Sequence, residues 1–292
     1  MFFNKASQRC ALVVAPDSLT IRGMPISKIT VRRVSEILIE NYGHREPRAR
    51  DPLDGLILII LSQATSDVNC DRAFSGLKSA FPSWDKCLNA PVEQIADSIR
   101  SGGLANQKAA RIKGLLGEIY AERGDFDLGW MHDASAEQCE AYLSKFHGVG
   151  PKTVACVLVF FLGKPAFPVD THVFRICKRL GWIREKSSPD EAHQVLKPLV
   201  PDDCKLDLHV NLIAHGRVIC RAAGNGGPRC EQCSIRRFCE FGKSVKVSNS
   251  TKNEGDSTTV EGKSESKRDP DFFVTIKQKK SLERVDEVEE VI

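Results

Sequence analysis

Apolar side chains recur every three or four residues along most of this chain. Between residues 27 and 43 the pattern predicts a first core helix. The uninterrupted apolar run 56–61 is too short to cross a membrane and predicts a buried helix. A helix over 68–80 is expected to follow, with Ser66 or Asp67 as its cap.

Six further segments have amphipathic spacing and predict helices: 92–99, 110–123, 136–146, 153–162, 171–180 and 206–215. Another helix is expected to begin at Ser188, because a proline follows the serine and a glutamate stands at the third helical position. Strand-like alternation is nearly absent, and no repeat of solenoid length is present. The sequence therefore predicts an all-α fold.

Candidate chemistry begins in the stretch 147–153, which reads His-Gly-Val-Gly-Pro-Lys-Thr. Gly148 and Gly150 allow a tight turn, and Pro151 suits the first position of a helix. Backbone N–H groups at such a helix start attract phosphate oxygens. The same partial positive charge disfavours a second cation, so Lys152 is expected to lose its proton more readily than a surface lysine.

A carboxylate follows eighteen positions later, in the stretch 168–172, which reads Pro-Val-Asp-Thr-His. Asp170 is placed to begin the next helix, a position that suits a carboxylate. A neutral lysine amine is a nucleophile, so the pair Lys152 and Asp170 favours covalent catalysis. The alternative is a hairpin that binds DNA phosphates and catalyses nothing.

These two stretches resemble the helix-hairpin-helix and catalytic-aspartate motif of the endonuclease III family of DNA glycosylases. The resemblance implies that Lys152 attacks the sugar carbon bearing the damaged base and that Asp170 assists. It implies two helical lobes with DNA across the cleft between them. One departure is His147, which stands where the family commonly has proline.

The resemblance also implies contacts with DNA. Leu104, in a glycine loop, matches the leucine that the family inserts as a wedge into the opposite strand. Gln63 matches the turn whose amide fills the gap left by a flipped base, although it stands one place early and Ala64 occupies the usual position. The remaining implied DNA-binding residues are Gly148, Val149, Gly150, Thr153 and His172.

Four cysteines form the pattern C-x9-C-x2-C-x5-C, namely Cys220, Cys230, Cys233 and Cys239. The spacing alone leaves the metal open, because zinc and a [4Fe–4S] cluster both accept four thiolates. The resemblance favours [4Fe–4S] over zinc, since the family places this cluster after a His-Gly-Arg helix and 215–217 reads His-Gly-Arg. The first interval is three residues longer than is usual in the family, around 225–227.

Domain organisation follows from the resemblance and from composition. The resemblance covers 27–243, with one lobe of about 53–165, a second lobe of 27–52 plus 166–219, and a cluster loop of 220–239. Residues 1–26 resemble either an organelle transit peptide or a plain flexible terminus. From residue 244 onward, polar and charged residues predict a disordered tail.

Charge and cysteine content add two constraints. The net charge is +4, but residues 244–292 hold nine Lys and Arg against eleven Asp and Glu, while the preceding 243 hold 33 against 27. The part expected to fold is therefore the basic part, which suits a polyanion. Of eleven cysteines, the seven outside the cluster are expected to be mostly buried thiols, because no secretory signal accompanies them.

The resemblance implies a bifunctional DNA glycosylase and AP lyase that removes oxidised pyrimidines from duplex DNA. The protein is expected to act as a monomer, away from membranes. The alternatives are a 5-methylcytosine glycosylase, because the stretches 61–67 and 166–171 also resemble the plant enzymes of that kind, and a non-catalytic DNA-structure binder. Basic groups near 267–268 and 277–280 suggest the nucleus, with a mitochondrion or plastid as the alternative.

Overall fold

The structure, a computed structural model, describes residues 20–21, 24–48 and 50–245. The predicted N-terminal flexible segment and C-terminal disordered tail lie almost wholly outside these residues. Within them the only strands are β1 (Thr20–Ile21) and β2 (Met24–Pro25), which pair with each other, and everything else regular is helical. The all-α prediction is confirmed. No helix in this part of the chain is long and apolar enough to span a membrane.

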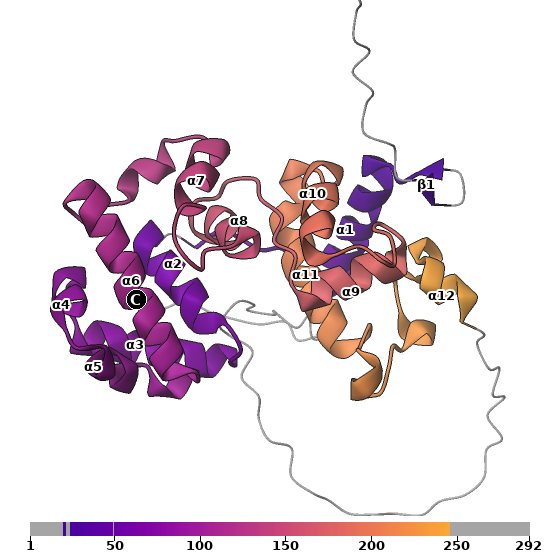
Figure 1. Cartoon of the computed structure of the whole chain (residues 1–292). Helices are drawn as coiled ribbons and strands as arrows, with labels where there is room; N and C mark the ends of the chain where they lie inside the picture. The colour runs from indigo at the N-terminus through magenta and orange to yellow at the C-terminus, as the bar shows by residue number, and fades with distance from the viewer. Residues whose placement is uncertain (1–19, 22–23, 49, 246–292) are drawn as a thin grey trace, which may run out of the picture.

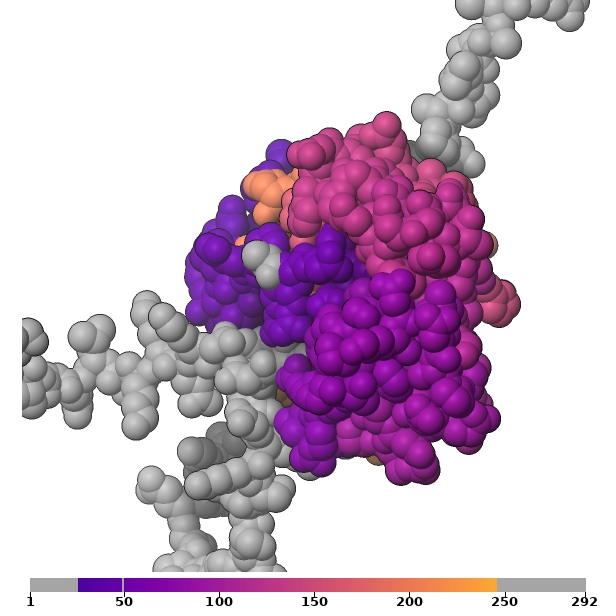
Figure 2. Space-filling model, turned by 90° about the vertical axis from the view of Figure 1, so that its left-hand side faces the viewer, coloured from indigo at the N-terminus to yellow at the C-terminus, as the bar shows by residue number. Residues whose placement is uncertain are grey.

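The first lobe is built around the apolar helix α2 (Pro52–Ser62), in which nine of eleven residues are buried. Around it lie α3 (Asp67–Ala80), α4 (Trp84–Asn89), α5 (Val92–Ser98), η1 (Arg100–Gly102), α6 (Ala105–Arg123), η2 (Gly129–His132), α7 (Ala136–Leu143) and α8 (Pro151–Phe161). Their apolar faces share one hydrophobic core with α2. Figure 2 shows this lobe from its outer side, where purple and magenta residues form a continuous surface.

The second lobe combines the first core helix with the C-terminal half of the chain (Figure 1). It contains α1 (Lys28–Tyr42), α9 (Thr171–Leu180), α10 (Pro189–Leu199), η3 (Asp202–Cys204), α11 (Lys205–Val218), η4 (Ala223–Asn225), η5 (Cys230–Gln232), η6 (Arg236–Phe238) and α12 (Glu240–Ser244). A second hydrophobic core joins them. α11 reaches both cores, because its Val210 packs in the first and its Leu208 in the second.

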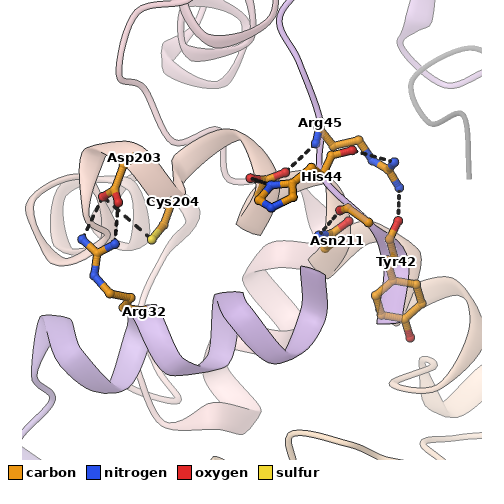
Figure 3. Close-up of polar contacts among 9 residues, drawn as sticks. Arg32, Tyr42, His44, Arg45, Asp203, Cys204 and Asn211 are labelled. Atoms are coloured by element: carbon orange, nitrogen blue, oxygen red, sulfur yellow. Dashed lines mark hydrogen bonds and ion pairs between the residues drawn. The ribbon is translucent and has the colours of Figure 1, made fainter. Parts of the chain in front are cut away.

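Polar contacts fix α1 against α11, although the two helices are far apart in sequence (Figure 3). Asn211 donates from its side-chain amide to the Gly43 carbonyl at 3.0 Å. The buried Asp207 accepts from the backbone N–H of Arg45 at 2.6 Å and contacts His44 Nδ1 at 3.0 Å. The connection from α1 to α2 is therefore tied to the helix that reaches both cores.

Helix starts follow the predicted caps. Ser66, rather than Asp67, caps α3 through the Asn69 N–H. The Ser188 hydroxyl and the Glu191 carboxylate form the reciprocal capping box expected at α10. These local contacts satisfy N–H groups that have no partner inside the helix.

Three expectations were wrong in detail. The helix expected over 110–123 begins at Ala105, because Leu104 adopts a left-handed conformation and its carbonyl accepts the first helical hydrogen bond, from the Lys108 N–H. The helix expected over 136–146 ends at Leu143, where the hairpin turn begins. α4 was not predicted, since six residues are too short to display a periodic pattern.

Candidate active site

The hairpin between α7 and α8 turns at two glycines, each for a different reason. Gly148 has φ +77°, and a Cβ there would lie 2.8 Å from Arg111 Nε, so the position tolerates no side chain. Gly150 is the N-cap of α8 and supplies no side-chain acceptor, and Pro151 is the first helical residue as predicted. The first-turn N–H groups of α8 therefore have no side-chain cap and suit an anion.

Lys152 and Asp170 line one pocket of about 670 Å³, open-solvent space included, at the boundary of the two lobes. Lys152 lies in the first turn of α8, and Asp170 is the N-cap of α9. Its Oδ1 accepts the Val173 N–H at 2.7 Å. The cap fixes the position of this carboxyl group in the pocket that Lys152 also lines.

Other side chains complete this pocket. Its remaining lining residues are Ile59, Ser62, Thr65, Asp67, Cys156, Phe160, His209, Val210, Ile213 and Arg217. They come from both lobes, and Arg217 of α11 forms an ion pair across the pocket with Asp67 of α3 at 3.4 Å. The pocket thus combines an apolar wall with convergent polar groups, as small-molecule and nucleotide sites do.

His209 is the pocket's buried histidine, with only 2% of its surface exposed. Its Nδ1 lies 2.8 Å from the Pro168 carbonyl, which can only accept, so Nδ1 carries the proton. Burial lowers the pKa of His209 to about 4, although the Asp170 carboxylate partly opposes the shift. The ring is therefore neutral at pH 7, and its Nε2 is a hydrogen-bond acceptor beside the Lys152 and Asp170 pair.

Sequence reasoning did not identify His209, Cys156 or Asp67 as pocket residues. Cys156 has a detectable signal, because it follows Lys152 by four positions on one helix and so shares its face. Burial raises the pKa of the Cys156 thiol, while the nearby Lys152 opposes that shift. His209 and Asp67 reach the pocket only through the packing of α11 and α3, which no local pattern encodes.

The predicted DNA-binding residues have different environments. Leu104 is 54% exposed and left-handed (φ +51°). Gln63 ends α2, and its side-chain oxygen accepts from Arg111 Nη1 at 2.8 Å. The side chains of Val149 and Thr153 are buried, so only their backbone groups remain for an outside partner. His172 is half-buried, and burial lowers its pKa.

The four predicted cluster cysteines line one hollow of about 270 Å³ in the second lobe. Nitrogen atoms lie near three of the sulfurs: Arg179 Nη1 donates to Cys220 Sγ at 3.1 Å, the Gly242 N–H donates to Cys239 Sγ at 3.2 Å, and His215 Nε2 lies 3.4 Å from Cys233 Sγ. Donors of this kind are the usual surroundings of metal-bound thiolates.

The pKa values of these thiols help to decide whether the cysteines suit a metal group. Burial raises the pKa of Cys233 to about 11, and the neighbouring thiols add to the shift. Burial likewise raises the pKa of Cys230 and Cys239. Four cysteines around one hollow are the ligand set that a [4Fe–4S] cluster takes, whereas a single ion would need ligands that converge more closely. In the described part of the chain, no three His, Cys, Asp or Glu side chains are placed to hold a single metal ion.

Comparison with known proteins places this geometry in a family. Residues 57–202 match the family described as HhH-GPD superfamily base excision DNA repair protein. The chain belongs to this superfamily. The resemblance to endonuclease III predicted from sequence is thereby confirmed.

The relatives of this HhH-GPD protein include DNA glycosylases. A putative DNA glycosylase of Arabidopsis thaliana, At3g47830, is 45% identical over 173 residues, which are 59% of each chain. Endonuclease III of Thermotoga maritima is 34% identical over 197 residues, covering 68% of this chain and 86% of that one. The chain therefore spans less than two thirds of the Arabidopsis relative and most of the bacterial one.

Among solved structures, a trapped endonuclease III–DNA covalent intermediate is similar to this HhH-GPD protein. Its TM-score is 0.61 at 28% identity, and the match covers 75% of this chain and 98% of that one. The structural match covers 75% of this chain, which is more than the segment 57–202. The similarity therefore extends beyond the segment that the family model matches.

Proposed function

We propose that this HhH-GPD protein is a bifunctional DNA glycosylase and AP lyase that acts on a modified base in duplex DNA. One observation carries the proposal: Lys152, in the first turn of α8, and Asp170, the N-cap of α9, line the same pocket between the lobes. The similarity to an endonuclease III caught as a covalent DNA intermediate supports a covalent route.

The chemistry follows from the two residue types. The target nucleotide leaves the helix and enters the pocket. The Lys152 amine bonds to C1′ of the sugar while the C1′–N bond breaks, and the base leaves with that electron pair and takes up a proton. Asp170 stabilises the positive charge on the sugar in the transition state and accepts the proton that the amine loses.

The lysine adduct then cuts the strand. The nitrogen of this glycosylamine forms a double bond to C1′ and expels the ring oxygen, which takes up the proton that Asp170 accepted. The sugar ring opens, and a protonated Schiff base remains on Lys152. This cation acidifies the C2′–H bond. Loss of that proton expels the 3′ phosphate by breaking the C3′–O bond, so the strand is cut on the 3′ side. Water finally releases the sugar remnant and regenerates the amine.

DNA binding is proposed for both sides of this pocket. The uncapped first turn of α8 suits a phosphate, through the backbone of Gly150 and Thr153. We propose that Leu104, which is exposed, enters the base stack as a wedge together with the Gln63 turn. We propose that His172, at the start of α9, contacts the backbone of the same strand.

The four cysteines would hold a [4Fe–4S] cluster as a structural group that keeps the arginine-rich loop in shape. Protein purified under nitrogen is expected to contain about four iron and about four acid-labile sulfide per chain. Cys239→Ala should lower both contents and the melting temperature, whereas Cys87→Ala, a buried thiol of the first lobe, should keep the metal. One zinc per chain and no sulfide would contradict the assignment.

Substrate choice is tested with three duplexes that carry thymine glycol, 5-methylcytosine or an abasic site. We expect free base from thymine glycol, together with a 3′ unsaturated-aldehyde end at both thymine glycol and the abasic site. Release from 5-methylcytosine alone would establish the demethylating alternative. Tight binding to all three duplexes without base release or cleavage would leave a DNA-structure binder and overturn the proposal.

A further inference from the structure

Lys108, in the first turn of α6, is a buried cation in the first lobe, with 4% of its surface exposed. Its Nζ donates to the Leu61 carbonyl at 2.7 Å and to the Gly102 carbonyl at 2.8 Å. Burial lowers its pKa. Burying an ammonium group is unfavourable unless it is hydrogen-bonded, so the two carbonyls are held firmly where they meet it.

Each of these carbonyls lies at the base of a different exposed turn. Leu61 precedes the turn after α2, which contains Gln63 and Ala64. Gly102 ends η1, directly before the loop that presents Leu104. Lys108 therefore joins the roots of two turns whose tips face outward.

The two turn tips share an unusual backbone state. Ala64 (φ +52°) and Leu104 (φ +51°) are the only non-glycine residues with positive φ in the described part of the chain. Residues with a Cβ adopt this region only where the surrounding structure holds them there. The two turns also lie close together, because a Cβ on Gly103, beside Leu104, would lie 4.0 Å from the Ala64 carbonyl oxygen.

A second contact between α6 and these turns comes from Arg111, which lies about one helical turn beyond Lys108. Arg111 donates to the Gln63 side-chain oxygen at 2.8 Å and also lies directly beneath Gly148 of the hairpin. Residues three apart share one helix face. One face of α6 therefore holds both turns, with the buried Lys108 as anchor and Arg111 nearer the surface.

We propose that Lys108 is a positioning residue for base extrusion. By fixing the Leu61 and Gly102 carbonyls it keeps the Gln63 turn and the Leu104 loop at one separation, so that both enter the duplex as a unit. The proposal rests on the glycosylase function proposed above. It assigns Lys108 to the opening of the base pair rather than to the chemistry at the sugar, because Lys108 lies outside the Lys152 pocket.

The test compares Lys108→Met with Lys113→Met. Lys113 lies on the same helix and also donates its ammonium to a carbonyl, that of Ala90, which lies between α4 and α5 and belongs to neither turn. Single-turnover base release is measured on the modified base opposite its normal partner and opposite an abasic site, where extrusion costs least. In Lys108→Met the rate of base release should fall by about tenfold or more on the paired duplex and by under about threefold on the unpaired one. In Lys113→Met the rate should stay near that of the wild type on both duplexes.

A second measurement leaves Lys108 intact, in case Lys108→Met does not fold. Gln63→Ala and Leu104→Ala each change one of the two turns. Together with the double variant they form a double-mutant cycle, in which base release is measured on the paired duplex. If the two turns act as one unit, the double variant should reduce the rate of base release by clearly less than the product of the two single-variant reductions.

Two results would contradict the assignment of Lys108 while leaving the glycosylase in place: an equal loss by Lys108→Met on both duplexes, or multiplicative losses in the cycle. No base release by the wild-type chain on any duplex would overturn the glycosylase itself and the assignment with it.

Discussion

Replacing Lys152 with glutamine is expected to reduce base release by about 10³-fold or more and to abolish strand cleavage at an abasic site. Glutamine keeps a similar length and polarity in the first turn of α8, so the helix and the pocket should persist. What disappears is the amine that bonds to the sugar carbon. Single-turnover base release and cleavage of an abasic duplex measure the two steps separately.

Lys145→Gln is the matched control for this change. Lys145 lies in the same hairpin turn but is exposed, pairs with Glu122 at 3.1 Å and is not part of the pocket. Its loss should leave both reactions within about twofold of the wild type, since surface ion pairs contribute little. Undiminished cleavage by Lys152→Gln would exclude Lys152 as the nucleophile.

Asp170→Asn is expected to reduce base release by about 10²-fold to 10³-fold with little effect on folding. Asparagine caps a helix nearly as well as aspartate, so α9 should keep its start at the Val173 N–H. The negative charge beside the cationic sugar is lost. Thermal unfolding and single-turnover base release, measured on the same preparation, separate the two roles of this carboxyl group.

Asp170→Ala removes the cap as well as the charge. It should match Asp170→Asn in base release and be less stable by about 1 kcal/mol. A full loss of activity in Asp170→Ala alone, with Asp170→Asn fully active, would show that the cap matters and the charge does not. That result would contradict the proposed role of Asp170 in catalysis.

Much of this fold is readable from the sequence because its signals are local. Helical spacing of apolar residues, the Ser188 capping box and the cap at Asp170 depend on neighbours within four positions. The same holds for the hairpin, in which Gly148 supplies a positive φ and Pro151 suits the first helical position. Such features were predicted correctly, although some helix boundaries moved and the short α4 was missed.

Other parts of the site were beyond prediction because they depend on tertiary contacts. His209 reaches the pocket through the packing of α11 against the first lobe, and its neutral state results from burial. The role of Lys108 depends on two carbonyls, one of them forty-seven residues away in sequence. Lysine at that position looks in sequence like any solvated residue of an amphipathic helix.

The Gln63 turn illustrates a middle case. Sequence comparison identified the turn but left its glutamine one place out of register with the family. In the structure Ala64 occupies the left-handed tip, while Gln63 ends α2 and is held by Arg111. Ala64, and not Gln63, therefore takes the strained conformation at the tip of the turn. Helical periodicity in the sequence does not show which of the two residues does so.

The central claim, that Lys152 forms the covalent bond to DNA, is tested most directly by locating the bond. Wild-type protein is reduced with borohydride on an abasic duplex, digested, and the DNA-linked peptide is sequenced by mass spectrometry. We expect the sugar remnant on Lys152, within the peptide that follows the hairpin glycines. A remnant on another lysine or on the terminal amine, or no adduct at all, would contradict the account.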